Sequence, residues 1–156
     1  MKKILIISTI FIIDRIVKAY LINLQDEGTE IDFYISSLLN IYLVWNTGIG
    51  FGLISSEADF FYHATTALII FINLALIYFM IKTQGAYSYF IAMIIGGAIG
   101  NLFDRVYYYA VPDFIDFHIG NFHWFIFNIA DIFITIGIIA LILIELKKNK
   151  KKAENG

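Results

Sequence analysis

The chain has 156 residues, of which 60% are hydrophobic and 15% charged, and its mean hydropathy of +0.77 is far above that of an ordinary soluble domain. It contains no cysteine, which excludes disulfides, thiolate metal sites and cysteine nucleophiles. The formal net charge of -2 says less than the places where the charges lie. We therefore expect a membrane protein, and with a single proline and no serine-rich linker we expect residues 1–156 to form one membrane domain.

Residues 4–24 are predicted to form the first membrane-spanning helix. Lys2, Lys3 and the apolar run after them resemble a signal peptide, but no small-residue cleavage site follows. Lys18 lies one helical turn after Asp14 and is expected to pair with it. Charges inside the hydrocarbon core are costly, so this pair is either a buried structural ion pair or part of a functional site.

Residues 25–59 carry six acidic residues and no lysine or arginine, which predicts an extracytoplasmic segment. Within it, residues 39–45 (LNIYLVW) are a β-prone run, and the sequence NTGIGFG follows from Asn46 to Gly52. Its three glycines allow tight turns and close approach of backbone to a ligand. We expect a small sheet or cradle here, and the glycine segment is either a simple turn or part of a site.

Three further apolar runs are long enough to span a bilayer: residues 60–81, 86–103 and 124–146. Gly96 and Gly100 form a GxxxG pair that allows another helix to pack closely. The stretch between them and the last run, residues 104–124, is interpreted as an interfacial belt because it is polar and aromatic. The fold class we predict is all-α, with four spanning helices and a small extracytoplasmic β cradle after the first.

Lysines lie at both ends of the chain, at Lys2 and Lys3 and again in the segment 147–152. Positive charge collects on the cytoplasmic side, so both termini are predicted to be cytoplasmic and the first and third loops extracytoplasmic. Asp131 lies 16 residues before Lys147, or roughly 24 Å along a helix, which places it near the outer surface of the membrane.

Four acids gather in the second half of the chain: Asp104, Asp113, Asp116 and Asp131. The pattern Asn-x-x-Asp occurs twice, at Asn101 and at Asn128, and on a helix this spacing places both side chains on one face. We expect the acids to converge at the outer membrane interface.

Two carboxylates held close together cannot both ionise easily, so one keeps its proton while the other acts as a base toward water. This is the arrangement of aspartic proteases, and the pair titrates as a unit. A metal site is an alternative, because Asp104, Asp113, Asp116 and His118 offer hard ligands, although no spaced histidine motif supports it. A proton-coupled transporter is another, with acids expected nearer the midplane, and a structural or assembly protein would need no convergent acids.

Five segments in order carry a resemblance to a known family: Asp14 with Lys18, WNTGIGFG from Trp45 to Gly52, GGAIGNLFDR from Gly96 to Arg105, VPDF from Val111 to Phe114, and FNIAD from Phe127 to Asp131. Over nearly the whole chain the sequence resembles the bacterial lipoprotein signal peptidases, or type II signal peptidases. The resemblance implies a catalytic dyad of Asp113 and Asp131. It also implies supporting roles for Asp14, Lys18, Asn46, Gly48, Asn101, Asp104, Arg105 and Asn128. Pro112 departs from the family pattern, where valine is more familiar, and removes an amide donor.

The same resemblance implies the reaction, which is hydrolysis of the peptide bond before a diacylglyceryl-modified cysteine in a prolipoprotein. It implies no metal and no cofactor. The expected partners are such prolipoproteins and membrane lipids, with no nucleic acid. The expected location is the bacterial cytoplasmic membrane, with the active site near its extracytoplasmic face. Asp116 matches no motif of the family and is expected to lie outside the dyad.

Overall fold

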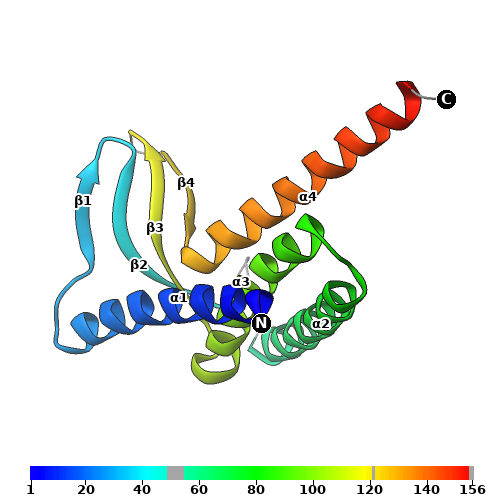
Figure 1. Cartoon of the computed structure of the whole chain (residues 1–156). Helices are drawn as coiled ribbons and strands as arrows, with labels where there is room; N and C mark the ends of the chain where they lie inside the picture. Colours follow the sequence, from blue (N-terminus) through cyan, green and yellow to red (C-terminus); the bar gives the residue numbers. More distant parts are fainter. Residues whose placement is uncertain (49–54, 121, 155–156) are drawn as a thin grey trace.

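The structure is a computed structural model that describes residues 1–48, 55–120 and 122–154 (Figure 1). Over these ranges the chain forms four helices and four strands. In chain order they are α1 (Lys2–Asp26), β1 (Asp32–Ser36), β2 (Leu39–Asn46), α2 (Ser55–Lys82), α3 (Ala86–Tyr108), β3 (Val111–Ile119), β4 (Phe122–Phe127) and α4 (Ile129–Glu154). Figure 1 shows the sheet at one side of the helices and the C-terminal half of α4 projecting away from the body of the molecule.

The central helix of the bundle is α3, which packs against α1, α2 and α4. Its glycines allow this close packing. A Cβ atom at Gly96 would lie 3.0 Å from the nearest α1 side chain, and one at Gly100 would lie 2.9 Å from Oδ2 of Asp14. On the opposite side, a Cβ atom at Gly97 would overlap the carbonyl oxygen of Ala130. The prediction that Gly96 and Gly100 admit a neighbouring helix is confirmed, and that helix is α1.

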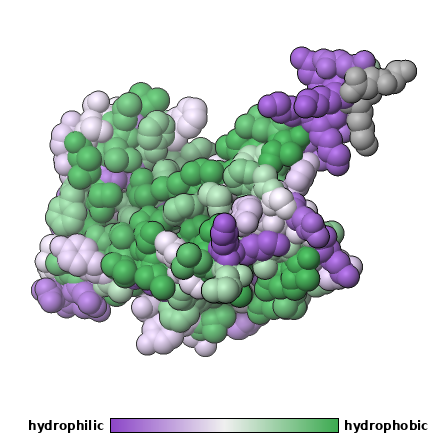
Figure 2. All heavy atoms as spheres, viewed as in Figure 1, coloured by the Kyte–Doolittle hydropathy of each residue, from purple (hydrophilic) through white to green (hydrophobic). Residues whose placement is uncertain are grey.

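The bundle buries polar side chains and exposes apolar ones. Asp14, Lys18 and Asp104 have no exposed surface, and Asn73 in α2 is buried, whereas large apolar side chains such as Phe71 point outward. This pattern is the reverse of a water-soluble bundle and suits contact with lipid. Figure 2 shows hydrophobic surface across most of the body of the molecule, with hydrophilic atoms on the projecting end of α4 and in smaller groups elsewhere.

Three helical segments are long and apolar enough to cross a membrane: Phe60–Lys82, Ala86–Tyr108 and Ile129–Lys151, with mean hydropathies of 2.3, 1.5 and 2.5. The protein is therefore a multi-pass membrane protein. α1 is of similar length but carries Asp14, Arg15 and Lys18 within its apolar stretch. Its membrane crossing consequently stays a prediction.

The four strands form one antiparallel sheet in the order β1-β2-β3-β4. The β-prone run at residues 39–45 is confirmed as a strand, since it makes up most of β2. The C-terminal half of α1 covers one face of the sheet, where Leu21 of the helix packs with Leu43 and Phe114. This contact joins the sheet to the helix bundle and fixes the position of β3.

The expectation of an all-α chain with strands only after the first helix is wrong in one respect. β3 and β4 come from the segment interpreted as an interfacial belt, so half of the sheet lies between α3 and α4 in the chain. The final helix was expected to begin at residue 124, but β4 continues to Phe127 and α4 starts at Ile129. Aromatic residues are common both at membrane interfaces and in strands, and local composition does not separate these environments. α3 also extends past the expected end at residue 103, to Tyr108.

Candidate active site

Asp113 lies in β3, between Asn46 at the end of β2 and Asn128 directly before α4. Its Oδ2 accepts a hydrogen bond from Nδ2 of Asn46 (2.8 Å), and its Oδ1 accepts one from Nδ2 of Asn128 (2.6 Å). Burial is the main cause of a raised pKa for this carboxyl group. The two amide hydrogen bonds act in the opposite direction, and the nearby charge of Asp131 raises the pKa further. Asp113 thus holds a proton more readily than an exposed aspartate.

Asp131 lies in the first turn of α4, where it takes part in a reciprocal cap. The backbone N–H of Asp131 donates to Oδ1 of Asn128 (3.1 Å), and the backbone N–H of Asn128 donates to Oδ2 of Asp131 (3.2 Å). This is a capping box, in which two side chains satisfy amides that a helix start leaves free. The second Asn-x-x-Asp pattern therefore marks the start of a helix, and the first lies within α3.

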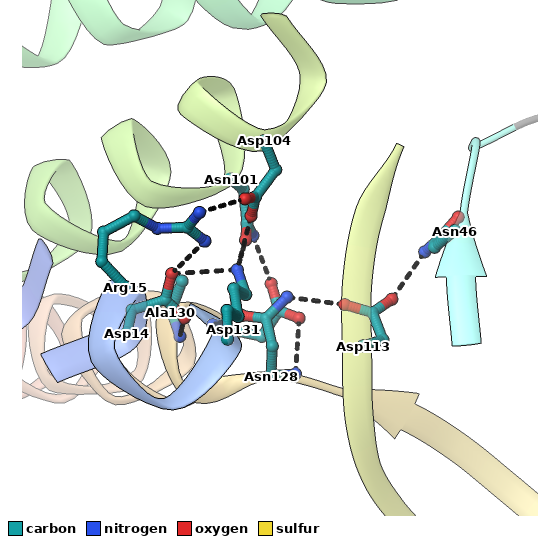
Figure 3. Close-up of polar contacts among 10 residues, drawn as sticks. Asp14, Arg15, Asn46, Asn101, Asp104, Asp113, Asn128, Ala130 and Asp131 are labelled. Carbon is teal, nitrogen blue, oxygen red and sulfur yellow. Dashed lines mark hydrogen bonds and ion pairs between the residues drawn. The ribbon is translucent and has the colours of Figure 1, made fainter. Parts of the chain in front are cut away.

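Asn128 links the two carboxylates. Its side-chain amide donates to Asp113, and its backbone amide donates to Asp131 (Figure 3). Both acids line one cavity of about 340 Å³. The polar residues lining it are Asn46, Asn73, Asn101, Arg105, Asp113 and Asp131, and its apolar wall comes from α2, α3, α4 and Val111. The cavity can hold a peptide-sized group with one polar end at the acids.

A compact group of charges lies beside this cavity, in the contact between α1 and α3. Nζ of Lys18 has three acceptors: Oδ2 of Asp104 at 2.7 Å, Oδ2 of Asp14 at 2.9 Å and Oδ1 of Asn101 at 3.1 Å. Arg15 reaches Asp104 at 2.5 Å and Asp14 at 3.1 Å. Two cations balance two anions, and all three protons of the buried ammonium have partners, which burial of a charge requires.

Two hydrogen bonds connect this charged group to the start of α4. Because Oδ1 of Asn101 accepts from Lys18, its Nδ2 faces Asp131 and donates to Oδ1 of that residue (2.7 Å). Oδ1 of Asp14 accepts from the backbone N–H of Ala130 (3.0 Å), an amide in the first turn of the helix. The partial positive charge of a helix start favours a carboxylate at this position. α1, α3 and α4 are thereby held in register around Asp131.

Asn46 also forms a tight turn next to the cavity. Its Oδ1 accepts from the backbone N–H of Gly48 (2.8 Å), and Gly48 has a φ of +72°, which favours glycine. A Cβ atom there would lie 2.7 Å from Nη2 of Arg105. The guanidinium of Arg105 in turn lies 5.8 Å from the ring centre of Tyr62, whose hydroxyl donates to the carbonyl oxygen of Arg105. Glycine is therefore favoured at position 48 for two reasons: the positive φ value of the backbone, and the guanidinium group that leaves no space for a Cβ atom.

Comparison with known proteins decides the family. The model of the family described as signal peptidase (SPase) II matches residues 6–147. The chain belongs to the signal peptidase II family.

Curated relatives agree with this assignment. A lipoprotein signal peptidase of Pelagibacter ubique (strain HTCC1062) is 51% identical over 147 residues, which are 94% of this chain and 89% of that protein. One from Anaplasma phagocytophilum (strain HZ) is 38% identical over 151 residues, covering 95% of this chain and 94% of the relative. The resemblance inferred from five motifs is confirmed.

A solved structure is also similar. It is described as a bacterial membrane enzyme studied by the in meso method at 1.9 Å resolution. It has a TM-score of 0.77 and 36% sequence identity, and the match covers 94% of this chain and 93% of the other. Neither this likeness nor the family assignment supports the transporter or the purely structural alternative.

All ten predicted site residues lie in the described part of this signal peptidase, around the cavity or in the adjoining charged group. The expected pairing of Asp14 with Lys18 is confirmed. Asp104 faces Lys18 and Arg15 on α1 and not its sequence neighbour Arg105, because adjacent helical residues point in different directions. Residues 49–52, the rest of the glycine segment, lie outside the described residues.

The four metal ligands of the alternative hypothesis do not form one group, although two of them, Asp116 and His118, lie close to each other. Asp104 belongs to the charged group, and Asp113 is bound by two asparagine amides. Asp116 and His118 lie elsewhere on the sheet. Because side chains alternate along a strand, Asp113 and Asp116 project from opposite faces of β3.

Sequence reasoning missed two residues. The sequence analysis assigned no role to Arg15, yet this residue contacts both acids of the charged group. Asn73 lines the cavity and is buried. Its isolated position in the apolar run of α2 was the available signal, because a polar residue there usually faces the interior of the bundle.

Proposed function

We propose that this signal peptidase is an aspartic endopeptidase that cleaves prolipoproteins directly before a diacylglyceryl-modified cysteine, with Asp113 and Asp131 as its catalytic pair. As a member of its family, the enzyme removes signal peptides from prolipoproteins. The observation that carries the proposal is that both carboxylates line one cavity and share Asn128 as a hydrogen-bond donor. Two acids so placed can hold one proton and one water between them.

We assign the shared proton to Asp113, because burial raises the pKa of this carboxyl group and Asn128 and Asn46 hold it in place. Asp131 takes a proton from the water, whose oxygen attacks the scissile carbonyl carbon, while Asp113 gives its proton to the carbonyl oxygen. The tetrahedral intermediate then collapses. Its hydroxyl proton returns to Asp113, and Asp131 gives its proton to the departing amine of the cysteine. One water is consumed, and both acids return to their starting state.

An apolar groove beside Asp131 supports the proposal that the substrate carries lipid chains. It has a volume of about 640 Å³ and lies between β4 and the first turns of α4. Its lining residues are Phe117, Phe125, Ile126, Phe127, Asp131, Ile132, Thr135 and Ile136. Asp131 therefore lines both this groove and the catalytic cavity. Acyl chains in the groove would hold the modified cysteine close to the catalytic pair.

We further propose that α1 is a fourth span, that both termini are cytoplasmic and that the site lies toward the extracytoplasmic face of the bacterial cytoplasmic membrane. Nζ of Lys3 donates to the carbonyl oxygens of Met80 (3.1 Å) and Thr83 (3.3 Å), so the N-terminus and the turn after α2 lie at one end of the bundle. The hydroxyl of Tyr87 also donates to Glu145, near the lysine-rich end of α4. Positive charge at this end supports a cytoplasmic location.

The catalytic proposal is tested with a diacylglyceryl-modified prolipoprotein as substrate, and its cleavage is measured as a change in mass. Asp113→Asn and Asp131→Asn should each lower the rate by more than about 10⁴-fold while the protein stays folded, since asparagine cannot exchange the proton. Asp116→Asn is the matched control on the same strand, and it should retain substantial activity. Near-normal cleavage by either dyad variant would sink the proposal.

All proton transfers in this mechanism are carried by the carboxyl groups of Asp113 and Asp131. Excess chelator should therefore leave the rate unchanged at a temperature well below the unfolding midpoint, and a loss of activity would favour the metal alternative. The unmodified prolipoprotein should be cleaved poorly if acyl chains occupy the apolar groove.

Orientation is tested by single-cysteine labelling in intact cells, because the natural chain has no cysteine. A probe at Glu27 should react from outside, whereas probes at Thr83 and Asn149 should react only after permeabilisation. An externally reactive Asn149 probe would overturn the four-span arrangement.

A further inference from the structure

Three metal-binding side chains lie together on the sheet, away from the catalytic cavity. Asp116 and His118 are two positions apart in β3 and share a face, and His118 is the Cα partner of His123 in β4. Asp113 is an odd number of positions away and points to the opposite face, where it contacts Asn128. The proposed catalytic reaction therefore does not use this group.

The spacing of the three side chains suits a metal ion. Oδ2 of Asp116 lies 2.8 Å from Nδ1 of His123 and 3.4 Å from Nδ1 of His118. One ligand atom from each residue can be chosen so that all lie within 4.8 Å of one another. Bonds of about 2.0–2.1 Å in a tetrahedral zinc site place neighbouring ligand atoms roughly 3.4 Å apart. Small side-chain movements would bring this group to that geometry.

Buried polar atoms without partners give an independent indication. Asp116 is 1% exposed and His118 is 7% exposed. Within the described part of the chain, Oδ1 of Asp116, Nδ1 of His118 and Oδ1 of Asn40 are buried and have no hydrogen-bond partner. Asn40 is the Cα partner of Asp116 on β2. Two of these atoms are acceptors that cannot satisfy each other, so they need a donor or a cation.

The group can be reached from solvent. An open cavity of about 340 Å³ adjoins it and is lined by Asp32, Asn40, Tyr42, Asp116, His123 and Ile126. His123 is largely exposed, with 54% of its side chain accessible. Asp32 adds a further carboxylate to the cavity lining, which favours entry of a cation.

We propose that Asp116, His118 and His123 bind a divalent transition-metal ion of the Zn²⁺ type, with water or Oδ1 of Asn40 as the fourth ligand. Two imidazoles and one carboxylate match Zn²⁺ and do not match Mg²⁺ or Ca²⁺, which prefer oxygen ligands alone. The ion would tie β3 to β4. Since β3 carries Asp113 and β4 leads directly into Asn128 and Asp131, the ion stabilises the hairpin that joins the two acids.

The test uses the full chain in detergent, without a histidine tag, after treatment with chelator. Zn²⁺ is added, and bound metal is measured by elemental analysis together with the thermal midpoint of unfolding. We expect one Zn²⁺ per chain and a higher midpoint, with no such effect from Mg²⁺. Co²⁺ in place of Zn²⁺ should give the intense visible absorption of a tetrahedral site.

His123→Ala is the main variant, because the exposed side chain can be removed without disturbing the core. It should weaken Zn²⁺ binding by more than about tenfold and abolish the rise in midpoint. His118→Ala should do the same. His63→Ala is the matched control, because His63 lies on α2 outside the group, and it should bind Zn²⁺ like the natural chain. Absence of bound Zn²⁺ in the natural chain, or equal binding by His123→Ala, would overturn the proposal and leave Asp116 and His123 as a simple hydrogen-bonded pair.

Discussion

The side-chain amide of Asn101 donates a 2.7 Å hydrogen bond to the carboxylate of Asp131, although the two residues are 30 positions apart in the chain. The orientation of this amide is set by Lys18, whose ammonium donates to the other end of the same side chain. A buried cation on α1 thus fixes an amide on α3, and this amide fixes a proposed catalytic acid on α4. Hydrogen bonds therefore connect the charged group to the proposed catalytic pair.

Replacement of Asn101 tests this connection. Asn101→Ala should lower turnover about tenfold or more, because hydrogen bonds to charged groups contribute about 1.5–3 kcal/mol and Asp131 would lose one. The measurement is the cleavage rate of folded, purified protein at saturating substrate. Asn149→Ala, on the exposed end of α4, is the matched control and should be indistinguishable from the natural chain. An unchanged rate in Asn101→Ala would show that this hydrogen bond does not position Asp131.

Asp113→Asn should stabilise the protein in a pH-dependent way. In the folded state the pKa of Asp113 is raised above its ordinary value of 3.8. The protonated side chain therefore contributes fully to the free energy of unfolding when the pH is below the pKa that Asp113 has in the unfolded chain. This stability is lost as the pH rises through the folded pKa. Asparagine stays neutral at every pH. The thermal midpoint of unfolding of Asp113→Asn should therefore exceed that of the natural chain when the pH is above the pKa of Asp113 in the folded state.

The two midpoints should converge toward acid pH, where both side chains are uncharged. Thermal unfolding in detergent over a pH series provides the measurement, with Asp26→Asn at the exposed end of α1 as control. If the difference between the two midpoints instead grows toward acid pH, the pKa of Asp113 is not raised by burial.

Lys18→Met should destabilise the fold strongly. Removing one partner from a buried ion pair costs about 3–5 kcal/mol, since the remaining charges stay buried without compensation. Adding Asp104→Asn should recover part of this loss, because it removes one of the acids that Lys18 neutralises. Lys148→Met on the exposed part of α4 provides the control. A midpoint for Lys18→Met close to that of Lys148→Met would show that Arg15 alone balances the two acids.

Gly48→Ala and Gly28→Ala separate backbone strain from crowding. Both glycines have positive φ values, of 72° and 87°, so alanine at either position should cost about 1–2 kcal/mol. Only at Gly48 would the new Cβ atom meet Arg105, whereas nothing lies within 4 Å of the one at Gly28. Gly48→Ala should therefore also lower turnover, and Gly28→Ala should not. Equal turnover in the two variants would contradict a role for the contact with Arg105 in the site.

The order of residues along the chain was enough to predict several features of the fold. Charged residues inside apolar runs predicted buried functional or structural ion pairs, because an isolated charge in hydrocarbon is too costly to occur without a partner. The i, i+4 spacing predicted the pairing of Asp14 with Lys18, and Gly96 with Gly100 predicted the close packing of a helix. These features depend on short distances along the chain and on the composition of a single segment.

Which segments meet became clear only from the folded structure. The strands β3 and β4 were not predicted, because an aromatic, polar stretch suits a membrane interface as well as a sheet, and pairing with β2 decides between them. The partner of Asp104 is likewise a residue of α1 and not its neighbour in sequence. Pair interactions of this kind depend on helix crossings and strand register, which many distant side chains set together. For the same reason, the face on which Asp116 meets His118 and His123 emerges only once the hairpin is folded.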